Sequence, residues 1–354
     1  MRLIATLFPV ILLNLSGFYN SAACAEEGAR LYTTREEKRE AGIRHRLLPW
    51  FVASGLAEFE WQWQKLDLDN PDRSDKSDNT AANIQGSFFI TPYDWIKSEI
   101  ITEYDTDTNE FIVDEAEMAF EYGPWELALG KLYLPFGVYF SHFANGPIIE
   151  FGETRATSVT LAYNYINNLD ISIAAYSGKA RKTGSSDRLD WSAGIEAWLS
   201  DELSAGISYI SDLADSGQHL LDEHENRFRN KVPALSGYML WASENYEITM
   251  EALGALESFT ELGSDRDQPL AANLEFTHFL NPDIDWSVRI EGSHEIEDAP
   301  VIQLGLAINY KILQNVFITV EALRGYFRNS LATDDAGNNY DSATTFGALL
   351  SVGF

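Results

Sequence analysis

The stretch "LAEFEWQWQ", residues 56–64, alternates between apolar or aromatic side chains and polar ones. Successive side chains of a β-strand point to opposite faces, so Phe59, Trp61 and Trp63 share one face. From residue 58 onward the other face carries only glutamate and glutamine side chains. The stretch therefore predicts a strand with one apolar face and one acidic, polar face.

Segments with the same period of two recur from residue 54 to the end of the chain. We place sixteen strands in this region, and an even number is what bacterial outer-membrane barrels contain. The predicted strands span 54–66, 80–91, 94–105, 110–122, 125–134, 156–165, 168–178, 187–199, 203–212, 233–243, 246–257, 269–280, 285–296, 300–311, 315–327 and 342–354.

The polar face of these segments distinguishes a membrane barrel from a soluble β-sandwich. The outer face of a soluble sandwich meets bulk water and usually carries mixed charges with many lysines. Here that face carries mainly Glu, Gln, Ser, Asn and Thr, while aromatic residues, 13% of the chain, recur at strand ends. An apolar band between two aromatic girdles is typical of transmembrane β-barrels. We predict an all-β outer-membrane barrel of about 16 antiparallel strands, porin-like, at 51–354.

The connections between the predicted strands alternate in length. Turns such as 123–124 and 281–283 are short and contain Gly, Pro, Asn or Asp, whereas connections such as 135–155 and 213–232 are long. Short periplasmic turns and long outer loops produce this rhythm in outer-membrane barrels. A sandwich gives no reason for it.

The N-terminal residues 1–25 have the features of a signal peptide. A positive residue near the start precedes an apolar core at 3–15, and small residues precede a cleavage point after Ala25. A lipoprotein site at Cys24 is the alternative, although the residues before it lack the usual aliphatic position. Residues 26–50 form a short charged segment, which we predict to be a periplasmic helix or a tail.

A sixteen-stranded barrel encloses a water-filled channel, and its inward side chains set the selectivity. Asp and Glu number 54 in this chain against 25 Lys and Arg, and the polar strand faces are rich in glutamate. Facing carboxylates favour cations and oppose anions. The alternative is a polar lumen whose acidity has no role in selection. The predicted lumen residues are Glu58, Glu60, Lys97, Glu99, Glu115, Glu117, Arg289 and Glu291.

The connection 135–155 is the third outer one, and we predict that it folds into the barrel and narrows the channel. Pro135 ends the preceding strand because it cannot donate to a sheet. Aromatic residues such as Phe140 and Phe143 suit the inner wall better than an exposed loop. A loop folded back over the rim is the alternative. The predicted constriction residues are Phe136, Tyr139, Glu150, Glu153 and Arg155.

The two ends of this connection resemble a known family. "GKLYLPFGVY" and "GPIIEFGETRATSVTLAY" are similar to the porin-type siderophore receptors, of which the legiobactin receptor is the type, most distinctively at Gly130–Gly137 and Glu150–Thr154. A weaker likeness extends from about residue 50 to the end, and 131–137 more distantly resembles phosphate-selective porins. The resemblance implies an outer-membrane channel that takes up ferric siderophore without a plug domain. It supplies no ligand residues.

Two outer connections carry positive charge that an anionic ferric complex would need, although ordinary solvated loop charge is the alternative. These basic residues are Lys179, Arg181, Lys182, Arg227 and Arg229. A third cluster, which includes His219, Asp222 and His224, has side chains that suit zinc or iron. Its spacing matches no defined site, so we favour a solvated loop there and predict no cofactor.

Two Ser-His pairs, at 141–142 and 293–294, invite a search for a hydrolase triad. Adjacent residues on a strand point to opposite faces, so neither pair can act as nucleophile and base. The chain also contains no G-x-S-x-G motif. We therefore predict a channel rather than an enzyme. The expected solute is an iron–siderophore complex, and the alternative is a general diffusion porin that prefers cations.

The predicted partners follow from this location. Outer-membrane lipid and lipopolysaccharide would surround the barrel, and the barrel-assembly machinery would recognise the last strand, which ends on Phe354 as such signals do. A homotrimer is one assembly open to such a barrel. The formal net charge of -29 excludes nucleic acid as a partner, because phosphate contacts need a positive surface.

Overall fold

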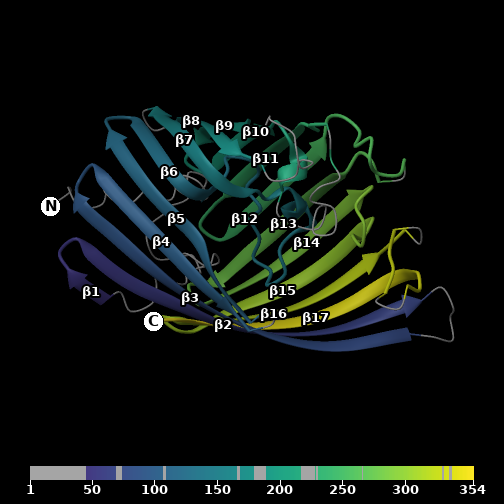
Figure 1. The fold of residues 1–354 in the computed structure, drawn as a ribbon. Coiled ribbons are helices and arrows are strands. Elements are labelled where there is room, and N and C mark those ends of the chain that lie inside the picture. Colours follow the sequence, from purple (N-terminus) through teal and green to yellow (C-terminus); the bar gives the residue numbers. More distant parts are fainter. Residues whose placement is uncertain are drawn as a thin grey trace.

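The computed structural model describes residues 45–68, 74–106, 109–165, 168–178, 189–216, 228, 230–264, 266–328, 331–334 and 337–354. Within these residues, sixteen antiparallel strands, β2 to β17, form a closed barrel (Figure 1). Pairing of β17 with β2 and of β9 with β10 completes the circle. The predicted fold class is confirmed.

The strand bounds agree closely with those predicted from the alternation. Strands β2 to β17 span Phe51–Leu68, Ser74–Tyr93, Ile96–Asp105, Glu110–Tyr122, Trp125–Tyr133, Arg155–Tyr165, Leu169–Ser177, Leu189–Ser200, Leu203–Ile210, Ala234–Ala242, Tyr246–Ala255, Leu270–Asn281, Ile284–His294, Ile302–Leu313, Val316–Tyr326 and Tyr340–Gly353. Two short 3-10 turns accompany them, η3 at Ile148–Gly152 and η4 at Leu213–Asp215. Among the described residues, no helix has the length and apolar character needed to cross a membrane.

The first hairpin is longer than predicted. β2 and β3 pair continuously from Phe51↔Ile90 to Asp67↔Ser74, so most of the predicted connection at 67–79 belongs to the two strands. Asp75 and Asp78 thus lie on β3. The predicted strands end at 66 and begin again at 80, but cross-strand pairing continues the sheet between them, so each backbone group there finds a partner.

A short strand precedes the barrel where we predicted a helix or a tail. β1, at His45–Leu48, pairs with the first residues of β2 from Phe51 to Ala53. Phe354 exchanges backbone hydrogen bonds with Gly55 a little further along the same edge of β2. β1 and the C-terminal residue therefore occupy successive parts of one strand edge. The predicted signal peptide, Cys24 and residues 26–44 lie outside the described residues.

The outer surface of the barrel is an apolar band between two aromatic belts. Exposed aliphatic side chains, among them Ile195 and Leu306, cover the middle of the strands. The ring centroids of Trp125 and Tyr163 lie 4.4 Å apart at the end of the barrel that carries the short turns. Trp191 and Tyr209 lie 4.7 Å apart at the opposite end. This arrangement suits a bilayer, because amphipathic rings lie at both of its interfaces.

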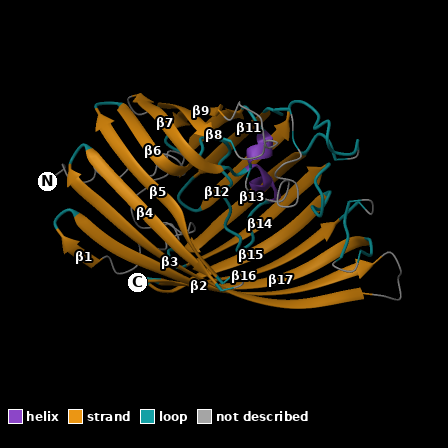
Figure 2. Ribbon diagram, viewed as in Figure 1, coloured by secondary structure: helices purple, strands orange, loops and turns teal. Residues whose placement is uncertain are grey.

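The long connections gather at one end of the barrel, and the short turns at the other, where β1 and the C-terminus also lie (Figure 1). Figure 2 shows the two 3-10 turns beside β11 and β13, and η3 packs against β12, β13 and β14. One long connection, 134–154, thus turns inward and positions the candidate site.

Candidate pore and inner loop

The connection between β6 and β7, residues 134–154, enters the barrel, and we call it the inner loop. Its two ends are joined, because the backbone N–H of Leu134 donates to the carbonyl of Thr154 at 2.9 Å. Gly137 has a φ of 75°, which favours glycine, and its N–H donates to Ser208 Oγ on β10 at 2.9 Å. The predicted inward fold of this loop follows from these contacts.

Buried wall carboxylates accept the backbone N–H groups of the inner loop. Glu251 on β12 accepts from Val138 at 2.8 Å and from Tyr139 at 2.9 Å. Glu275 on β13 accepts from the backbone of His142 at 2.7 Å. The irregular loop has no strand neighbour of its own, so these carboxylates satisfy donors that would otherwise be buried without acceptors.

Two further glutamates continue this row along the wall. Glu321 on β16 accepts from the backbone N–H of Ala144 at 2.8 Å, and Glu291 on β14 accepts from Ile148 at 2.7 Å. At the tip, the Asn145 side chain accepts a hydrogen bond from Gln62 on β2 at 3.2 Å. The inner loop therefore crosses the wall from β10 to β16 and reaches β2.

Arg289 lies beneath the loop and neutralises part of this row. The guanidinium of Arg289, whose residue is 1% exposed, donates to Ser141 Oγ at 2.9 Å and to the Asn145 carbonyl at 3.0 Å. It also pairs with Glu291 at 3.0 Å and lies over the ring of Phe143 at 4.2 Å. The prediction that Arg289 and Glu291 line the open lumen is wrong, because the loop covers both side chains.

His142 forms a second buried polar contact under the loop. Its Nε2 lies 3.0 Å from Glu247 Oε1, and its Nδ1 lies 4.0 Å from Asp285 Oδ1. Burial alone would lower the pKa of His142, but the hydrogen bond and charge of Glu247, with the charges of Asp285 and Glu275, raise it to about 9. The imidazole is therefore protonated at neutral pH and bound to the wall by charge.

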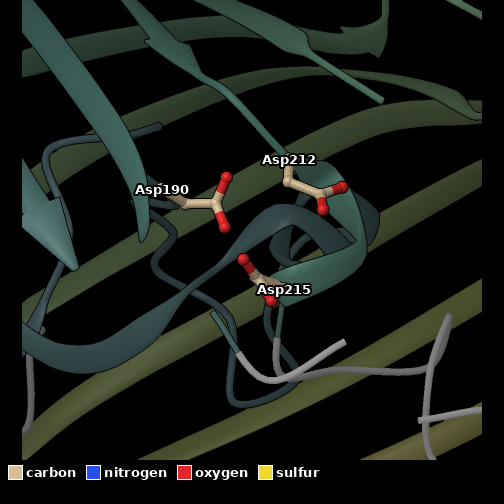
Figure 3. A group of neighbouring side chains, drawn as sticks. All are labelled: Asp190, Asp212 and Asp215. Atoms are coloured by element: carbon tan, nitrogen blue, oxygen red, sulfur yellow. The ribbon is translucent and has the colours of Figure 1, made fainter. Parts of the chain in front are cut away.

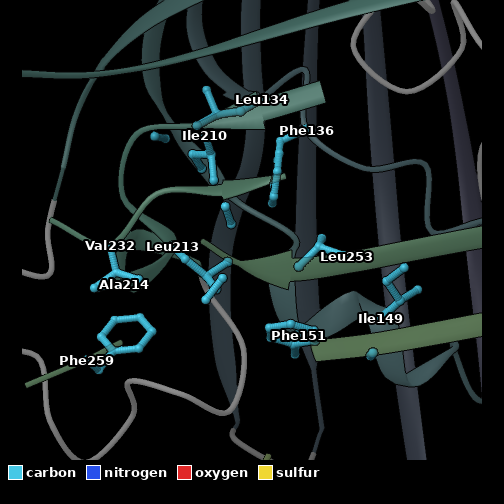
Figure 4. Close-up of a cluster of buried hydrophobic side chains, with 14 of the residues drawn as sticks. Leu134, Phe136, Ile149, Phe151, Ile210, Leu213, Ala214, Val232, Leu253 and Phe259 are labelled. Carbon is cyan, nitrogen blue, oxygen red and sulfur yellow. The ribbon is translucent and has the colours of Figure 1, made fainter. Parts of the chain in front are cut away.

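Apolar side chains fill the space between the inner loop and the outer connections (Figure 4). Phe136 and Phe151 from the inner loop belong to one buried cluster with Leu213, Phe228 and Phe259, which come from the connections after β10 and β12. This packing closes part of the mouth on the β7 to β13 side. Aromatic and aliphatic burial of this extent stabilises the loop on the wall.

The predicted constriction residues take three different positions. Phe136 and Tyr139 are buried in the apolar cluster, so they anchor the loop and do not face the opening. Glu150 and Glu153 are half-buried on the returning part of the loop. Burial, followed by the charges of Glu251, Glu153 and Glu150, raises the pKa of Tyr139. Both carboxylates therefore lie near that hydroxyl and remain constriction candidates.

Arg155 pairs with the barrel wall rather than with the inner loop. It is the first residue of β7, where Ala156 is buried on the inner side and the side chains alternate from there. The guanidinium forms an ion pair with Asp114 on β5 and lies 5.4 Å from the ring centroid of Tyr133 on β6. Arg155 therefore contacts the wall at β5 and β6, and its role at the constriction stays a prediction.

The remaining predicted lumen residues lie on the wall of β2 to β6. Glu58 on β2 accepts a hydrogen bond from Ser351 at 2.8 Å. Lys97 on β4 forms an ion pair with Glu121 on β5. The strand register places Glu99 opposite Glu117, and Ile101 opposite Glu115. The acidic side chains of this wall are Glu58, Glu60, Glu99, Glu103, Glu115, Glu117, Glu121 and Glu126.

The sequence therefore located the acidic side chains but not their two different roles. Those on β12 to β16 hold the inner loop, and those on β2 to β6 form the wall across from it. A signal was present in the sequence, because an aromatic, donor-rich loop and a set of inward glutamates both needed partners. The pairing itself depends on which strands the loop reaches.

Other predicted residues lie outside the described part of the chain. These are the basic loop residues Lys179, Arg181, Lys182, Arg227 and Arg229, and the metal-like residues His219, Asp222 and His224. A different carboxylate cluster, formed by Asp190, Asp212 and Asp215, lies at the outer mouth (Figure 3). The sequence alone does not reveal this cluster, because a strand and a turn separate the three aspartates along the chain.

Comparison with known proteins supports the fold. No protein-family model matches the chain. A UPF0422 protein of Coxiella burnetii is 28% identical over 260 residues, which cover 66% of this chain and 54% of the relative. The chain thus spans about half the length of this curated relative.

The structural neighbours are outer-membrane porins. The anion-selective porin of Comamonas acidovorans matches with a TM-score of 0.62 and 8% identity, over 86% of this chain and 99% of that chain. OmpF of Salmonella typhi, solved with daunomycin, matches at 0.57 and 11% over 86% and 97%. The channel DcaP of Acinetobacter baumannii matches at 0.56 and 14% over 88% and 99%.

The chain has the porin fold. Together with the apolar band and the two aromatic belts, this fold makes it an integral β-barrel of the bacterial outer membrane. Sequence identities this low show only that the folds are alike. A porin named as anion-selective has the same fold, so the fold does not determine which ions pass. These relatives do not confirm the resemblance to siderophore receptors, and selectivity must be argued from this chain's own wall.

Proposed function

We propose that this porin-like channel is a diffusion pore that prefers small cationic solutes over anionic ones. The observation that supports the proposal is the acidic wall of β2 to β6, which carries eight glutamates. The glutamates of β12 to β16 contribute less, because loop N–H groups, Arg289 and His142 compensate them.

The size of the preference follows from Coulomb's law in confined water. Two unit charges 4 Å apart interact by about 1 kcal/mol in bulk water and by about 4 kcal/mol at an effective dielectric constant of about 20. A pore lies between these limits, and about 1.4 kcal/mol corresponds to a tenfold difference in occupancy. Several carboxylates on one wall therefore support a cation preference of about tenfold at low salt.

A ferric siderophore is a second candidate solute, and one observation favours it. The two stretches that resemble siderophore receptors, Gly130–Gly137 and Glu150–Thr154, are the entrance and the return of the inner loop. A loop of that kind would set which complex passes. The acidic wall favours a cationic or neutral complex over an anionic one.

Reversal potentials in planar bilayers test the first proposal. Under a KCl gradient, the purified barrel should give the sign of reversal potential expected for K⁺ permeation. Substitution of Glu99→Gln together with Glu117→Gln should reduce that potential, whereas Glu202→Gln in the turn between β9 and β10 should not. A reversal potential of zero or of the anion sign would refute cation preference.

The same bilayers separate the two candidate solutes. A specific pore for ferric siderophore should lose current when micromolar ferric complex is added, because a bound complex occupies the constriction. The iron-free siderophore is the matched control. Current that is unaffected by either form supports the general diffusion pore and excludes the specific one.

A further inference from the structure

A row of basic side chains crosses the lipid-facing side of four neighbouring strands, β16, β17, β2 and β3 (Figure 1). Arg324 on β16 lies opposite Thr344 on β17, and Thr344 lies opposite Lys65 on β2. Lys65 in turn lies opposite Lys76 on β3. Thr344 shares its strand face with Phe346, which is 45% exposed, so the row faces the outside of the barrel. We call Arg324, Lys65 and Lys76 the basic row.

The basic row places two positive charges directly against each other. Lys65 and Lys76 are opposite in register, and like charges in that position destabilise a strand pair. Asp67 lies 2.5 Å from Lys65 Nζ and 3.1 Å from the Arg324 guanidinium, so it serves those two cations. Lys76 is exposed and forms no ion pair with any residue that the structure describes. An anion between Lys65 and Lys76 would therefore remove a repulsion.

Aromatic rings mark the level of the basic row as a membrane interface. The Arg324 guanidinium lies 5.5 Å from the ring centroid of Tyr326, which is exposed. The rings of Trp63 and Phe346 lie 5.7 Å apart, one step closer to the apolar band. Asp78 lies opposite Trp63 on the same face, so this interface carries both signs of charge. Amphipathic rings gather where lipid headgroups lie, and the basic row lies at that height.

An apolar groove of about 500 Å³ lies beside the basic row, on the same strands but nearer the middle of the apolar band. The exposed rings of Phe59 and Trp61 line it, with the small residues Ala82 opposite Phe59 and Ala348 opposite Trp61. Four residues of β2 separate Trp61 from Lys65, which is about 13 Å. Half of the hydrocarbon core of a bilayer is about 15 Å thick. An acyl chain can therefore occupy the groove while its headgroup lies on the basic row.

We propose that the basic row and the groove together bind one phosphorylated, acylated glycolipid of the outer leaflet, the lipid A part of lipopolysaccharide. Its phosphates lie on the basic row, where ammonium and guanidinium groups donate to their oxygens. One of its acyl chains lies in the groove beside Phe59 and Trp61. The site is on the outside of the wall, so the proposal does not rest on which solute the channel carries.

The width of the basic row favours this lipid over an ordinary phospholipid. The row extends over three strand spacings, or about 14 Å, so it can bind two phosphates carried by one disaccharide. An ordinary phospholipid headgroup offers only one phosphate. Basic residues at a membrane surface attract anionic lipid, and this row provides them on a chain whose formal net charge is -29.

Lipid titration of the refolded, lipopolysaccharide-free barrel, followed by native mass spectrometry, tests the proposal. In detergent with EDTA, which excludes bridging divalent cations, the wild type should retain one bisphosphorylated lipid A per barrel. Lipid A stripped of both phosphates should bind at least about tenfold more weakly, because each basic residue contributes about fivefold. Inorganic phosphate at the same concentration should not compete, because it cannot fill the groove. Equal binding of the two lipid forms, or full competition by phosphate, would overturn the proposal.

Two variants locate the lipid. Lys76→Gln should weaken binding of bisphosphorylated lipid A about fivefold and leave the phosphate-free form unchanged, whereas Arg46→Gln, exposed on β1 at the opposite end, should change neither. Ala348→Leu fills the groove and should weaken binding of both forms; Ala116→Leu, on the same face of β5 as the exposed Met118, is its control. Lipid A binding that neither Lys76→Gln nor Ala348→Leu changes would refute the site. Barrel oligomers that Ala348→Leu disperses, with no lipid bound to the wild type, would show that a second copy of the chain occupies the groove instead.

Discussion

Substitution of Glu251 by alanine should release the first part of the inner loop from the wall. This carboxylate accepts the N–H groups of Val138 and Tyr139 and the hydroxyl of Ser236, at 2.8–2.9 Å. A buried donor left without an acceptor costs about 1–3 kcal/mol, so the two backbone groups together cost about 2–6 kcal/mol. The anchors at Glu275 and at the loop tip remain, so the barrel itself should stay folded.

Hydrogen exchange measures this loosening directly. A loss of about 2 kcal/mol should accelerate exchange of the Val138 and Tyr139 amides by about 30-fold. Single-channel current should become noisier, because the loop borders the opening. Glu251→Gln keeps one acceptor oxygen and should have a smaller effect. Glu117→Ala on the opposite wall is the control. Unchanged exchange and unchanged current noise in Glu251→Ala would refute the idea that wall carboxylates hold the loop.

Three further predictions concern the pore. Deletion of 138–150 should raise single-channel conductance sharply, because it removes the loop tip; the same conductance as the wild type would mean that this segment does not narrow the channel. Glu117→Lys should lower the K⁺ over Cl⁻ preference in reversal-potential measurements, and an unchanged preference would remove this wall from the selectivity filter. The charged His142–Glu247 pair stabilises the loop fully below the ordinary histidine pKa of 6.5 and is lost as the pH rises through about 9. Amide exchange in the loop should therefore accelerate between pH 7 and pH 10 in the wild type, and His142→Asn should show no such step beyond the intrinsic pH dependence; an equal step in both would exclude His142 as its source.

The strand pattern was readable because a barrel wall imposes a simple rule. Neighbouring residues alternate between the two sides of the wall, with Phe59 facing lipid and Glu58 facing the lumen. The period of two therefore identified each strand and, at the same time, the face on which each side chain lies. The exceptions have local causes. The first hairpin extends through an acidic segment, and β1 pairs with β2 in a region whose charge suggested a helix or a tail.

Site residues were predicted less well. Strand alternation assigns a side chain to the inner or outer face of the barrel, but it does not show whether a loop packs over that side chain. Glu291 and Arg289 face inward as expected, yet the inner loop buries both. Arg155 follows the loop in sequence, but its side chain pairs with Asp114 on β5 beside Tyr133. Residues within a loop carry no such alternation, so Phe136 could not be assigned to the wall or the opening beforehand.

The amino-acid sequence by itself determined the barrel, its polarity and its acidic lumen, because hydrophobic periodicity and charge act locally along each strand. Only the tertiary structure decided which carboxylates serve the pore. Glu251 and Glu117 are alike in sequence context, but one meets loop N–H groups and the other faces a wall neighbour, Glu99. The loop partners of Glu251, Val138 and Tyr139, are more than a hundred residues away along the chain, and only the tertiary fold brings them within hydrogen-bonding distance.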